Sequence, residues 1–479
     1  MKQQKLLINS VSLLSNRLIQ GISTFALTTI IARNLGAEQL GQYVLAIGYY
    51  SVFVTFFGLG IRTLFIRELA KEGEKAPIYL VSGTLLQFIL SIIAYFSLVI
   101  VVFLMPYSVE TSNICYILGL SVIPFALSNI TEAIFQAQER MYLIAVTTAP
   151  IYLLRVGAMI WVVLNCDRAI EYVGAIMVIS EVSILILQWL LITRTVKPEW
   201  QIDRQFTIDS FNAAKTLFAI DGFGVIAGKL DILLISLLGN EVLIGIYGAI
   251  RQMIQPFEII CSSICAAVFP RLSSLVILGK DAQRANIEKF LDLLLCISLP
   301  LIPTVFFTYG YDILIFIYKN PEFAQGEAPL KIVGIFVMLF PVIRLFNYLL
   351  LANRMEKYNL REVIITTTFG CLMGMFLIPR YQLVGAAWMG VSMSLCSASI
   401  AIYAININLF KIRWVKILRR PLLITGLVLF LLFVLHQLHL KMALNLSILV
   451  IFYLLVAISI LMNQLGKLSM LQKLLAGRS

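Results

Sequence analysis

Apolar stretches long enough to cross a membrane recur along almost the whole chain. A transmembrane helix needs about 20 mostly apolar residues, and we count fourteen such stretches. They lie near residues 10–32, 42–60, 78–104, 113–136, 142–164, 170–193, 213–238, 243–269, 290–317, 331–351, 362–379, 384–409, 422–437 and 443–462. Only 13% of the residues are charged, whereas soluble proteins have about 25%. The sequence therefore predicts an all-α polytopic membrane protein with about 14 transmembrane helices.

The basic residues between these stretches predict the side of the membrane on which each loop lies. If the N-terminus is cytoplasmic, 26 Lys and Arg residues fall on the cytoplasmic side and 6 on the other side. This asymmetry follows the positive-inside rule for short loops, so we expect both termini to be cytoplasmic. The net charge of +12 then reflects topology and contact with anionic lipids, and it does not indicate a nucleic-acid partner.

Three short motifs occur twice at nearly the same spacing. RNLGAEQLGQY at 33–43 returns as SLLGNEVLIGIY at 236–247, AQERM at 137–141 returns as ANRM at 352–355, and YVGA at 172–175 returns as LVGAA at 383–387. The shifts lie between 203 and 214 residues, and each pair occupies the corresponding boundary in a set of six spans. This order indicates an internal duplication. With an even number of spans in each half, the repeat is parallel, as in transporters built from two similar lobes.

The duplication predicts the domain organisation. We expect an N-lobe at 1–193, a cytoplasmic linker at 194–212, a C-lobe at 213–409, a basic cytoplasmic loop at 410–421, a last pair of spans at 422–462 and a cytoplasmic tail at 463–479. In the first copy of the first motif, we interpret Gly36 and Gly41 as the residues that permit a tight reversal between two helices.

Five cations lie inside the apolar stretches, where a charge is costly. They are Arg17, Arg155, Lys229, Arg251 and Arg344. At about 2.5–3.5 kcal/mol each near a helix centre, five such residues facing lipid would cost on the order of 12–18 kcal/mol. They should therefore face a cavity or a charged partner. Because arginine donates hydrogen bonds to phosphate oxygens in pairs, these cations are candidate substrate-binding residues, and structural pairing with acids is the alternative for each.

Acidic residues lie at similar depths in the same stretches. They are Glu181, Asp221, Asp231 and Glu258, with Glu132 nearer the cytoplasmic end of its span. Arg251 and Glu258 are seven residues apart and share one helix face, about 10 Å from each other. Some of these acids should neutralise cations on neighbouring helices. An intramembrane carboxylate is also a candidate for binding a coupling proton or sodium ion, so both interpretations stay open.

The sequence lacks the signatures of several other functions. It contains no GxxxxGK[ST] loop for ATP hydrolysis, its outer loops are short, and no catalytic set of residues lies outside the spans. We therefore expect no enzymatic activity and no cofactor. The seven cysteines lie in or at the ends of apolar stretches, which indicates packing residues and no metal site.

Further segments carry a resemblance to a known family. The chain contains GLGIRTLFIRELA (58–70), FQAQERM (135–141), KLDILLISLLGNEVLIGIYGAI (229–250), FPRLSSL (269–275) and FLIPRYQLVGAAW (376–388). As an ordered set with RNLGAEQLGQY, these segments resemble the polysaccharide transporter family of bacterial flippases. That family includes the O-antigen flippases and belongs to the superfamily of multidrug, oligosaccharidyl-lipid and polysaccharide exporters.

The resemblance implies a fold and an activity. The fold would be two six-helix lobes that form a V around a central cavity. The activity would be movement, by alternating access, of an oligosaccharide carried on a polyprenyl pyrophosphate from the inner to the outer leaflet of the bacterial cytoplasmic membrane, for lipopolysaccharide or other surface polysaccharide. The implied partners are this lipid-linked oligosaccharide, membrane lipids, and polysaccharide polymerase and chain-length proteins.

Two alternative functions stay open at this point. A multidrug exporter of the same superfamily is the first, although the last two spans and five buried cations suit an anionic substrate better. A membrane-embedded glycan polymerase or ligase is the second, and it would be expected to carry a large outer loop with clustered charges, which this sequence lacks.

Overall fold

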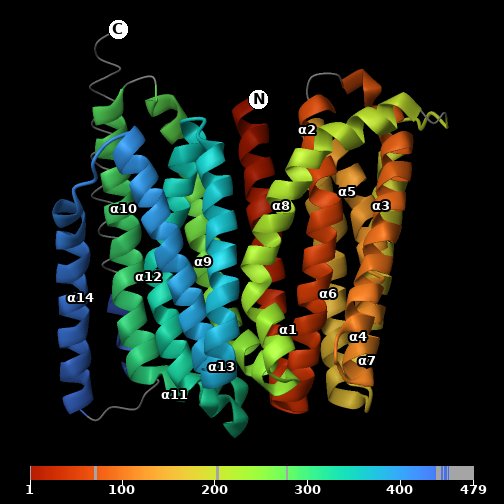
Figure 1. Ribbon diagram of the computed structural model, residues 1–479. Helices are drawn as coiled ribbons and strands as arrows, with labels where there is room; N and C mark the ends of the chain where they lie inside the picture. Colours follow the sequence, from red (N-terminus) through yellow and green to blue (C-terminus); the bar gives the residue numbers. More distant parts are fainter. Residues whose placement is uncertain are drawn as a thin grey trace. The chain divides into compact units, whose positions relative to one another are not determined.

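The computed structural model describes residues 2–69, 73–200, 204–276 and 279–438, and short helical pieces at 444–445, 447–449 and 451–452. The side chains of residues 2–19, 59, 60, 63, 67, 73, 204, 206, 209, 213–221, 267, 270, 301–305 and 436 lie outside this description. The described residues are helical apart from short turns (Figure 1). The elements are α1 (Lys2–Val54), η1 (Thr55–Leu59), α2 (Gly60–Leu69), η2 (Gly73–Lys75), α3 (Ala76–Leu104), α4 (Val109–Gly119), α5 (Val122–Ala137), α6 (Met141–Asn165), α7 (Ala169–Ile192), α8 (Arg204–Leu238), α9 (Glu241–Leu275), α10 (Lys280–Ile302), η3 (Pro303–Thr308), α11 (Tyr309–Tyr318), η4 (Pro321–Gly326), α12 (Glu327–Ala352), α13 (Glu356–Asn408) and α14 (Trp414–Gln437).

Nine helices in the described part of the chain are long and apolar enough to cross a membrane. Two of them, α1 and α13, contain a break, at Gly36 and at Gln382, where the backbone leaves helical geometry. Each break falls between two predicted spans, so each of these long helices holds two of them. The prediction of an all-α polytopic membrane protein is confirmed. The predicted span at 443–462 lies mostly outside the described residues.

The chain packs as two compact units. The first consists of Met1–Pro256, Leu314–Pro329 and Val363–Met389, and the second consists of Phe257–Ile313, Leu330–Glu362 and Gly390–Ser479. Helices α9, α11, α12 and α13 each contain a boundary between the two units. The N-lobe, the C-lobe and the other domain boundaries stay predictions.

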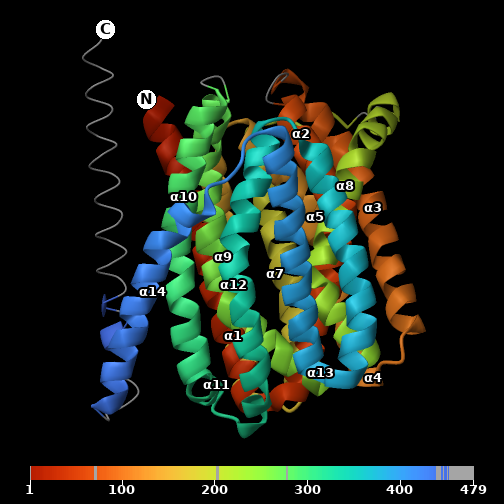
Figure 2. The same cartoon turned by 60° about the vertical axis from the view of Figure 1, so that its left-hand side comes forward.

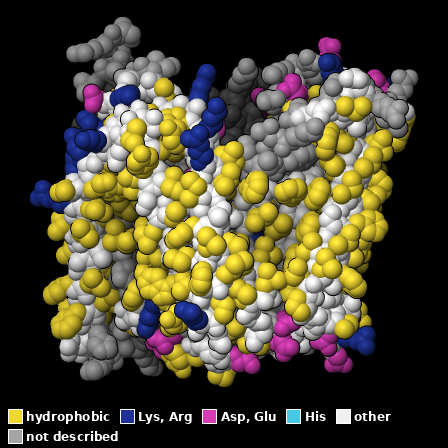
Figure 3. All heavy atoms as spheres, viewed as in Figure 1, with side chains coloured by type: hydrophobic (Ala, Val, Ile, Leu, Met, Phe, Trp, Pro, Cys, Tyr) yellow, Lys and Arg dark blue, Asp and Glu magenta, His cyan; other side chains and the backbone are white. Residues whose placement is uncertain are grey.

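In the first unit, α3 has an apolar outer face, and its buried face holds three polar side chains among apolar ones. It lies at one edge of that unit in two views (Figures 1 and 2), and its side chains Phe96 and Phe103 are 60% and 77% exposed. Hydrophobic side chains cover this edge (Figure 3). The buried face instead carries Ser82, Gln87 and Ser91. This is the pattern of a helix whose outer solvent is lipid and whose polar groups are hydrogen-bonded between helices.

Gln87 supports the π-helical segment η1. The π-helix is a rare local geometry that is often found at functional sites. The Gln87 side-chain amide donates a hydrogen bond of 3.1 Å to the carbonyl of Phe57 within η1. A fully buried side chain on α3 thus satisfies a carbonyl in the irregular segment between α1 and α2.

The two copies of the first repeated motif lie against each other in the first unit. A methyl group on Gly41 would lie 1.8 Å from the carbonyl oxygen of Glu241, and a methyl group on Gly245 would lie 1.9 Å from the carbonyl oxygen of Ala37. The contact is reciprocal, because both pairs are related by one shift of 204 residues. Helices α1 and α9 therefore meet backbone against backbone, which only glycine at both positions permits.

Only one of the two glycines predicted to form the turn does so. Gly36 has a φ of +85° and interrupts α1, as expected for a glycine at a reversal. Gly41 lies inside the helical segment that follows, and its role is the close approach to α9. The turn interpretation was wrong for Gly41 because a glycine needed for packing looks the same in sequence as one needed for a turn.

The two copies of the second repeated motif form the same kind of turn. After α5, Glu139 has a φ of +56°, and after α12, Arg354 has a φ of +58°. The amide of Arg140 donates to the carbonyl of Phe135 at 2.8 Å, and the amide of Met355 donates to the carbonyl of Leu350 at 2.9 Å. Both are the six-to-one hydrogen bond of a Schellman motif.

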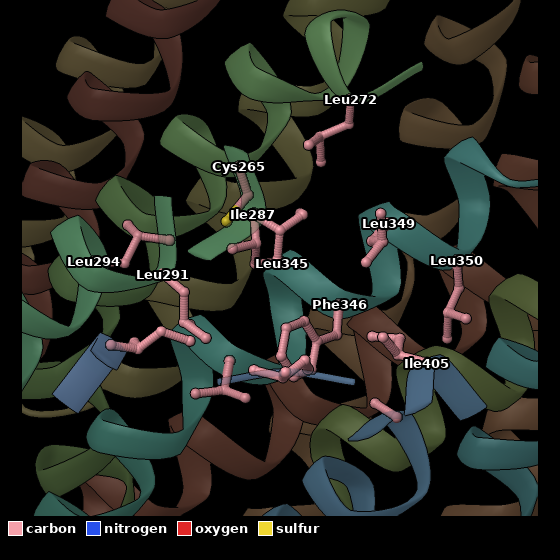
Figure 4. Packing of buried hydrophobic residues seen from close by; sticks show 14 of the residues in the cluster. Cys265, Leu272, Ile287, Leu291, Leu294, Leu345, Phe346, Leu349, Leu350 and Ile405 are labelled. Carbon is pink, nitrogen blue, oxygen red and sulfur yellow. The ribbon is translucent and has the colours of Figure 1, made fainter. Parts of the chain in front are cut away.

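A large apolar cluster forms the core of the second unit (Figure 4). Helix α12 contributes Leu345, Phe346 and Leu349, which pack with side chains of α9, α10 and α13. Cys261 and Cys265 also lie in this cluster. The ring of Phe346 lies 6.2 Å from the ring of Trp414, edge to face, which connects α12 to the start of α14.

We predict that Phe346→Ala destabilises the protein by about 3–5 kcal/mol, the usual loss for a buried aromatic side chain. Phe346 is fully buried, whereas Phe430 on α14 is 67% exposed. Phe430→Ala is therefore the matched control and should leave stability nearly unchanged. Thermal unfolding of the purified variants in detergent measures both effects. Equal unfolding temperatures for the two variants would contradict the packing described for α12.

Candidate functional site

Arg155 on α6 and Glu181 on α7 form a buried ion pair in the first unit. The guanidinium nitrogen lies 2.9 Å from the carboxylate oxygen, and the side chain of Glu181 is only 3% exposed. The guanidinium also lies over the ring of Tyr152, 4.4 Å from its centroid, and the Tyr152 hydroxyl is hydrogen-bonded to Gln20 on α1. The carboxylate of Glu181 on α7 and the ring of Tyr152 on α6 thus hold Arg155 in place. The Tyr152 hydroxyl connects this group to α1.

Arg251 on α9 and Asp231 on α8 form a looser ion pair. The Nε of Arg251 lies 3.5 Å from Oδ2 of Asp231, and the two side chains are 26% and 13% exposed. The other oxygen of Asp231 accepts a hydrogen bond from the amide of Ile232. The partner that connects Arg251 to α8 is therefore Asp231. Lys229 and Glu258 each interact with another group as well.

Arg344 on α12 differs from both of these arginines. Its side chain is exposed, and its guanidinium lies 5.1 Å from the centroid of the Phe340 ring. Among the described residues no ion pair includes Arg344, but its charge interacts with the buried carboxyl of Glu362 on α13. At about 1.5 Å per residue, Arg344 lies roughly 12 Å before the end of α12 at Ala352. It is an exposed cation in the predominantly apolar part of α12.

Two of the predicted site residues cannot be placed further. Arg17 lies on α1 and Asp221 lies on α8, but both side chains are outside the described residues. The described side chains thus bring Arg155 together with Glu181 and Arg251 together with Asp231. The substrate-binding and ion-coupling roles of all nine residues stay predictions.

A third polar cluster of the first unit was missed in the sequence. Arg62 at the start of α2 makes an ion pair of 2.8 Å with Glu132 on α5 and donates to Asn129 at 3.2 Å. Gln188 on α7 donates to the other oxygen of Glu132 and accepts from Thr131. Because Arg62 follows a predicted span, it counted as a loop cation. The signal that could have found this cluster is the spacing of Asn129 and Glu132, one helical turn apart in an apolar span.

An ion pair in the second unit includes a residue of the predicted basic loop at 410–421. Arg413 donates two hydrogen bonds, of 2.9 and 2.8 Å, to the carboxylate of Glu288 on α10. Glu288 precedes the predicted span at 290–317. Burial opposes its ionisation, but the hydrogen bonds and charge of Arg413 outweigh burial, so the pKa of Glu288 lies below its usual range. This bidentate pair ties the start of α14 to α10.

Apolar helices that enclose paired charges define this chain as a polytopic α-helical membrane protein. The profile of a family described as polysaccharide biosynthesis protein matches residues 6–276, more than half of the chain. The chain belongs to this family. No curated protein sequence matches it.

Solved structures of transporters share the fold. A lipid II flippase, MurJ, in an inward closed conformation has a TM-score of 0.76 and 15% identity, and the match covers 96% of this chain and 99% of the flippase. An inward-facing multidrug resistance MATE family transporter of the MOP superfamily has a TM-score of 0.64 and 13% identity, over 85% of this chain and 95% of the transporter. The MATE multidrug transporter DinF-BH has a TM-score of 0.61 and 14% identity, with the same coverage. At these identities the likeness establishes the fold, and the family inferred from the sequence is confirmed.

We predict that the Arg155–Glu181 pair behaves as a coupled unit. Removing one partner of a buried ion pair costs about 3–5 kcal/mol, whereas replacing both partners with apolar residues is often close to neutral. Arg155→Leu should therefore lower the thermal unfolding temperature in detergent more than the double variant Arg155→Leu/Glu181→Leu. A double variant that loses the sum of the two single effects would show that the two residues do not interact.

We predict that the contribution of Arg413 to stability depends on pH. Because the pKa of folded Glu288 is depressed, the stabilisation is complete above the unfolded value of about 4.3 and is lost as the pH falls through the folded value. Arg413→Gln should lower the unfolding temperature at pH 7. The difference from the unsubstituted protein should begin to shrink below about pH 4.3 and disappear once the pH lies below the depressed pKa of folded Glu288. Arg419→Gln is the control, since Arg419 has no described ion-pair partner. A difference independent of pH would contradict the assignment.

Proposed function

We propose that this protein is a flippase for polyprenyl-pyrophosphate-linked oligosaccharides. It moves them by alternating access across the bacterial cytoplasmic membrane, for the synthesis of O-antigen or another surface polysaccharide, with both of its termini in the cytoplasm. Membership of the polysaccharide biosynthesis family and the fold shared with a lipid II flippase and with multidrug exporters support this proposal. Polysaccharide polymerase and chain-length proteins are the proposed functional partners.

The environment of Arg344 is the observation that supports an anionic substrate. An arginine near a helix centre costs about 2.5–3.5 kcal/mol when it faces lipid. Arg344 is exposed, lies well inside α12 and makes no ion pair among the described residues, although its charge interacts with the buried carboxyl of Glu362 on α13. A water-filled cavity is the setting that accommodates such a side chain, and its planar fork suits two phosphate oxygens. Arg155 and Arg251 already have acidic partners, so substrate would have to displace these acids.

Glu181, Asp221, Asp231 and Glu258 are the proposed candidates for ion coupling. Glu181 and Asp231 are the two whose arginine partners are described. A proton or sodium ion that replaces the arginine would release Arg155 or Arg251 for an anion, which would connect ion binding to substrate binding. Amide variants of the four acids, assayed with an imposed ion gradient, test this step. Unchanged gradient dependence in every variant would remove it.

We predict that Arg344→Ala reduces transport about tenfold or more, because a hydrogen bond to a charged group is worth about 1.5–3 kcal/mol. Arg344→Lys should retain part of the activity, since it keeps the charge and loses the fork. Arg380→Ala, which removes an exposed arginine near the break of α13, should have no effect. The assay is complementation of a deletion strain, with measurement of surface polysaccharide and of lipid-linked intermediates on the cytoplasmic side.

The same deletion strain tests the proposed function itself. Loss of surface polysaccharide and accumulation of the lipid-linked intermediate support a flippase. Normal polysaccharide with no accumulated intermediate, in a strain that lacks a redundant flippase, contradicts it. Increased sensitivity to cationic dyes with normal polysaccharide would identify a multidrug exporter instead.

A further inference from the structure

We propose that Glu362 on α13 is a positioning residue for Arg344. Its charge offsets that of the arginine through space and leaves the guanidinium nitrogens available to a diphosphate. Ser397 and Asn347 hold the carboxyl in place for this role. All four residues belong to the second unit. The inference rests on the proposed substrate-binding role of Arg344, and it adds the residues that keep this arginine ready to bind.

The carboxyl of Glu362 is buried and receives hydrogen bonds from neutral donors. The residue is only 5% exposed. Its Oε1 accepts a hydrogen bond from the hydroxyl of Ser397, which lies beyond the break of α13 at Gln382. The side-chain amide of Asn347 on α12 also donates to this carboxyl. Burial opposes ionisation of Glu362, whereas these hydrogen bonds and the guanidinium of Arg344 favour it. One carboxyl thus connects α12 with both sections of α13.

Arg344 lies beside this carboxyl and keeps its side chain exposed. Asn347 follows Arg344 by about one helical turn, and its carbonyl accepts a hydrogen bond of 3.1 Å from the side-chain amide of Asn359 on α13. This bond holds the two helices side by side close to the depth of Arg344. The guanidinium lies 5.1 Å from the centroid of the Phe340 ring, and its charge interacts with Glu362. Arg344 is therefore in the field of a carboxyl with which it forms no ion pair.

This arrangement differs from that of the paired arginines of the first unit. Arg155 contacts Glu181 at 2.9 Å, so an anion would have to break that ion pair before it could bind. At Arg344, the donors from Ser397 and Asn347 occupy the carboxyl and hold it away from the guanidinium. The two opposite charges still attract each other over the longer distance, which lowers the cost of an exposed cation in a membrane helix. A diphosphate can then bind Arg344 without separating it from a carboxylate.

Chemical modification of arginine tests this arrangement without any substrate. Phenylglyoxal modifies accessible guanidinium groups of the full-length protein in detergent, and mass spectrometry of the peptides gives the rate at each arginine. We expect Ser397→Ala to lower the rate at Arg344 about fivefold, because the released carboxylate then forms an ion pair with the guanidinium. Glu362→Gln should raise the rate, since it removes the charge that favours the protonated guanidinium. Once Glu362→Gln is present, adding Ser397→Ala should have no further effect.

Two controls accompany the modification experiment. Arg354, which is exposed at the turn after α12, should react at the same rate in every Ser397 and Glu362 variant. Glu356→Gln removes an exposed acid in the first turn of α13 and should leave the rate at Arg344 unchanged. The positioning role is overturned if Ser397→Ala and Glu362→Gln leave the rate at Arg344 unchanged. It is also overturned if the effect of Ser397→Ala persists in the presence of Glu362→Gln.

Transport kinetics distinguish positioning from structural support alone. The substrate is a polyprenyl-diphosphate-linked oligosaccharide in proteoliposomes. Ser397→Ala should raise KM about fivefold with little change in kcat, because the carboxylate competes with the diphosphate for Arg344. Glu362→Gln should lower KM and kcat together, since the arginine then binds the anion more tightly and releases it more slowly. A loss of kcat at constant KM in both variants would indicate a structural role and contradict the proposal.

The two experiments separate this inference from the proposed function. If the unsubstituted protein does not transport the lipid-linked oligosaccharide but the modification rates respond as expected, the proposed substrate is wrong and the positioning role stands. If the unsubstituted protein transports it and the rate at Arg344 does not respond to either substitution, the positioning role is wrong and the proposed function stands.

Discussion

The approach of two backbones at Gly41 and Gly245 is the constraint on which the first unit depends. It fixes where α9 lies against α1, and α1 in turn packs along α6. The same arrangement places Asp231 on α8 within reach of Arg251 on α9. Because helix separation at this point is set by atoms of the main chain, small changes in side-chain size there would displace the charged groups further along the same helices. Close packing at one end therefore determines the geometry of the polar groups in the interior.

The free-energy cost of an unpaired charge inside a membrane explains how the polar groups of the first unit are arranged. Helix α3 turns Phe96 and Phe103 outward and buries Ser82, Gln87 and Ser91 among apolar side chains, so its outer face is more apolar than that of a helix that faces water. Arg62, Arg155 and Arg251 each have a carboxylate from another helix. Such pairs fix the rotation of each helix about its own axis, since an arginine turned toward lipid would lose its partner. Arg344, in the second unit, is exposed and makes no ion pair among the described residues.

The sequence predicts the helices well and the contacts between them poorly. Hydrophobic length specifies a span directly, so the positions of most helices could be read from composition alone. The repeated motifs indicated a duplication, but the paired Schellman turns at Glu139 and Arg354 were seen only in the structure. The partner of Arg251 could not be read in this way. Glu258 shares its helix face, but Asp231 reaches it from α8, and this depends on the tertiary packing of two helices. For the same reason Arg62 looked like a loop residue, and Gly41 looked like part of a turn.

Reciprocity at the glycine contact has a consequence for the origin of the chain. When residue i of one segment touches residue j of another, and the equivalent of j touches the equivalent of i, the arrangement has the form of an isologous interface, which identical subunits make about a two-fold axis. Ala37, Gly41, Glu241 and Gly245 meet in this way within one polypeptide. A half-length ancestor with a single copy of the motif could have made the same contact as a homodimer with both subunits in the same membrane orientation. Gene fusion would then have converted a dimer interface into an internal one, free to become asymmetric everywhere except where two main chains touch.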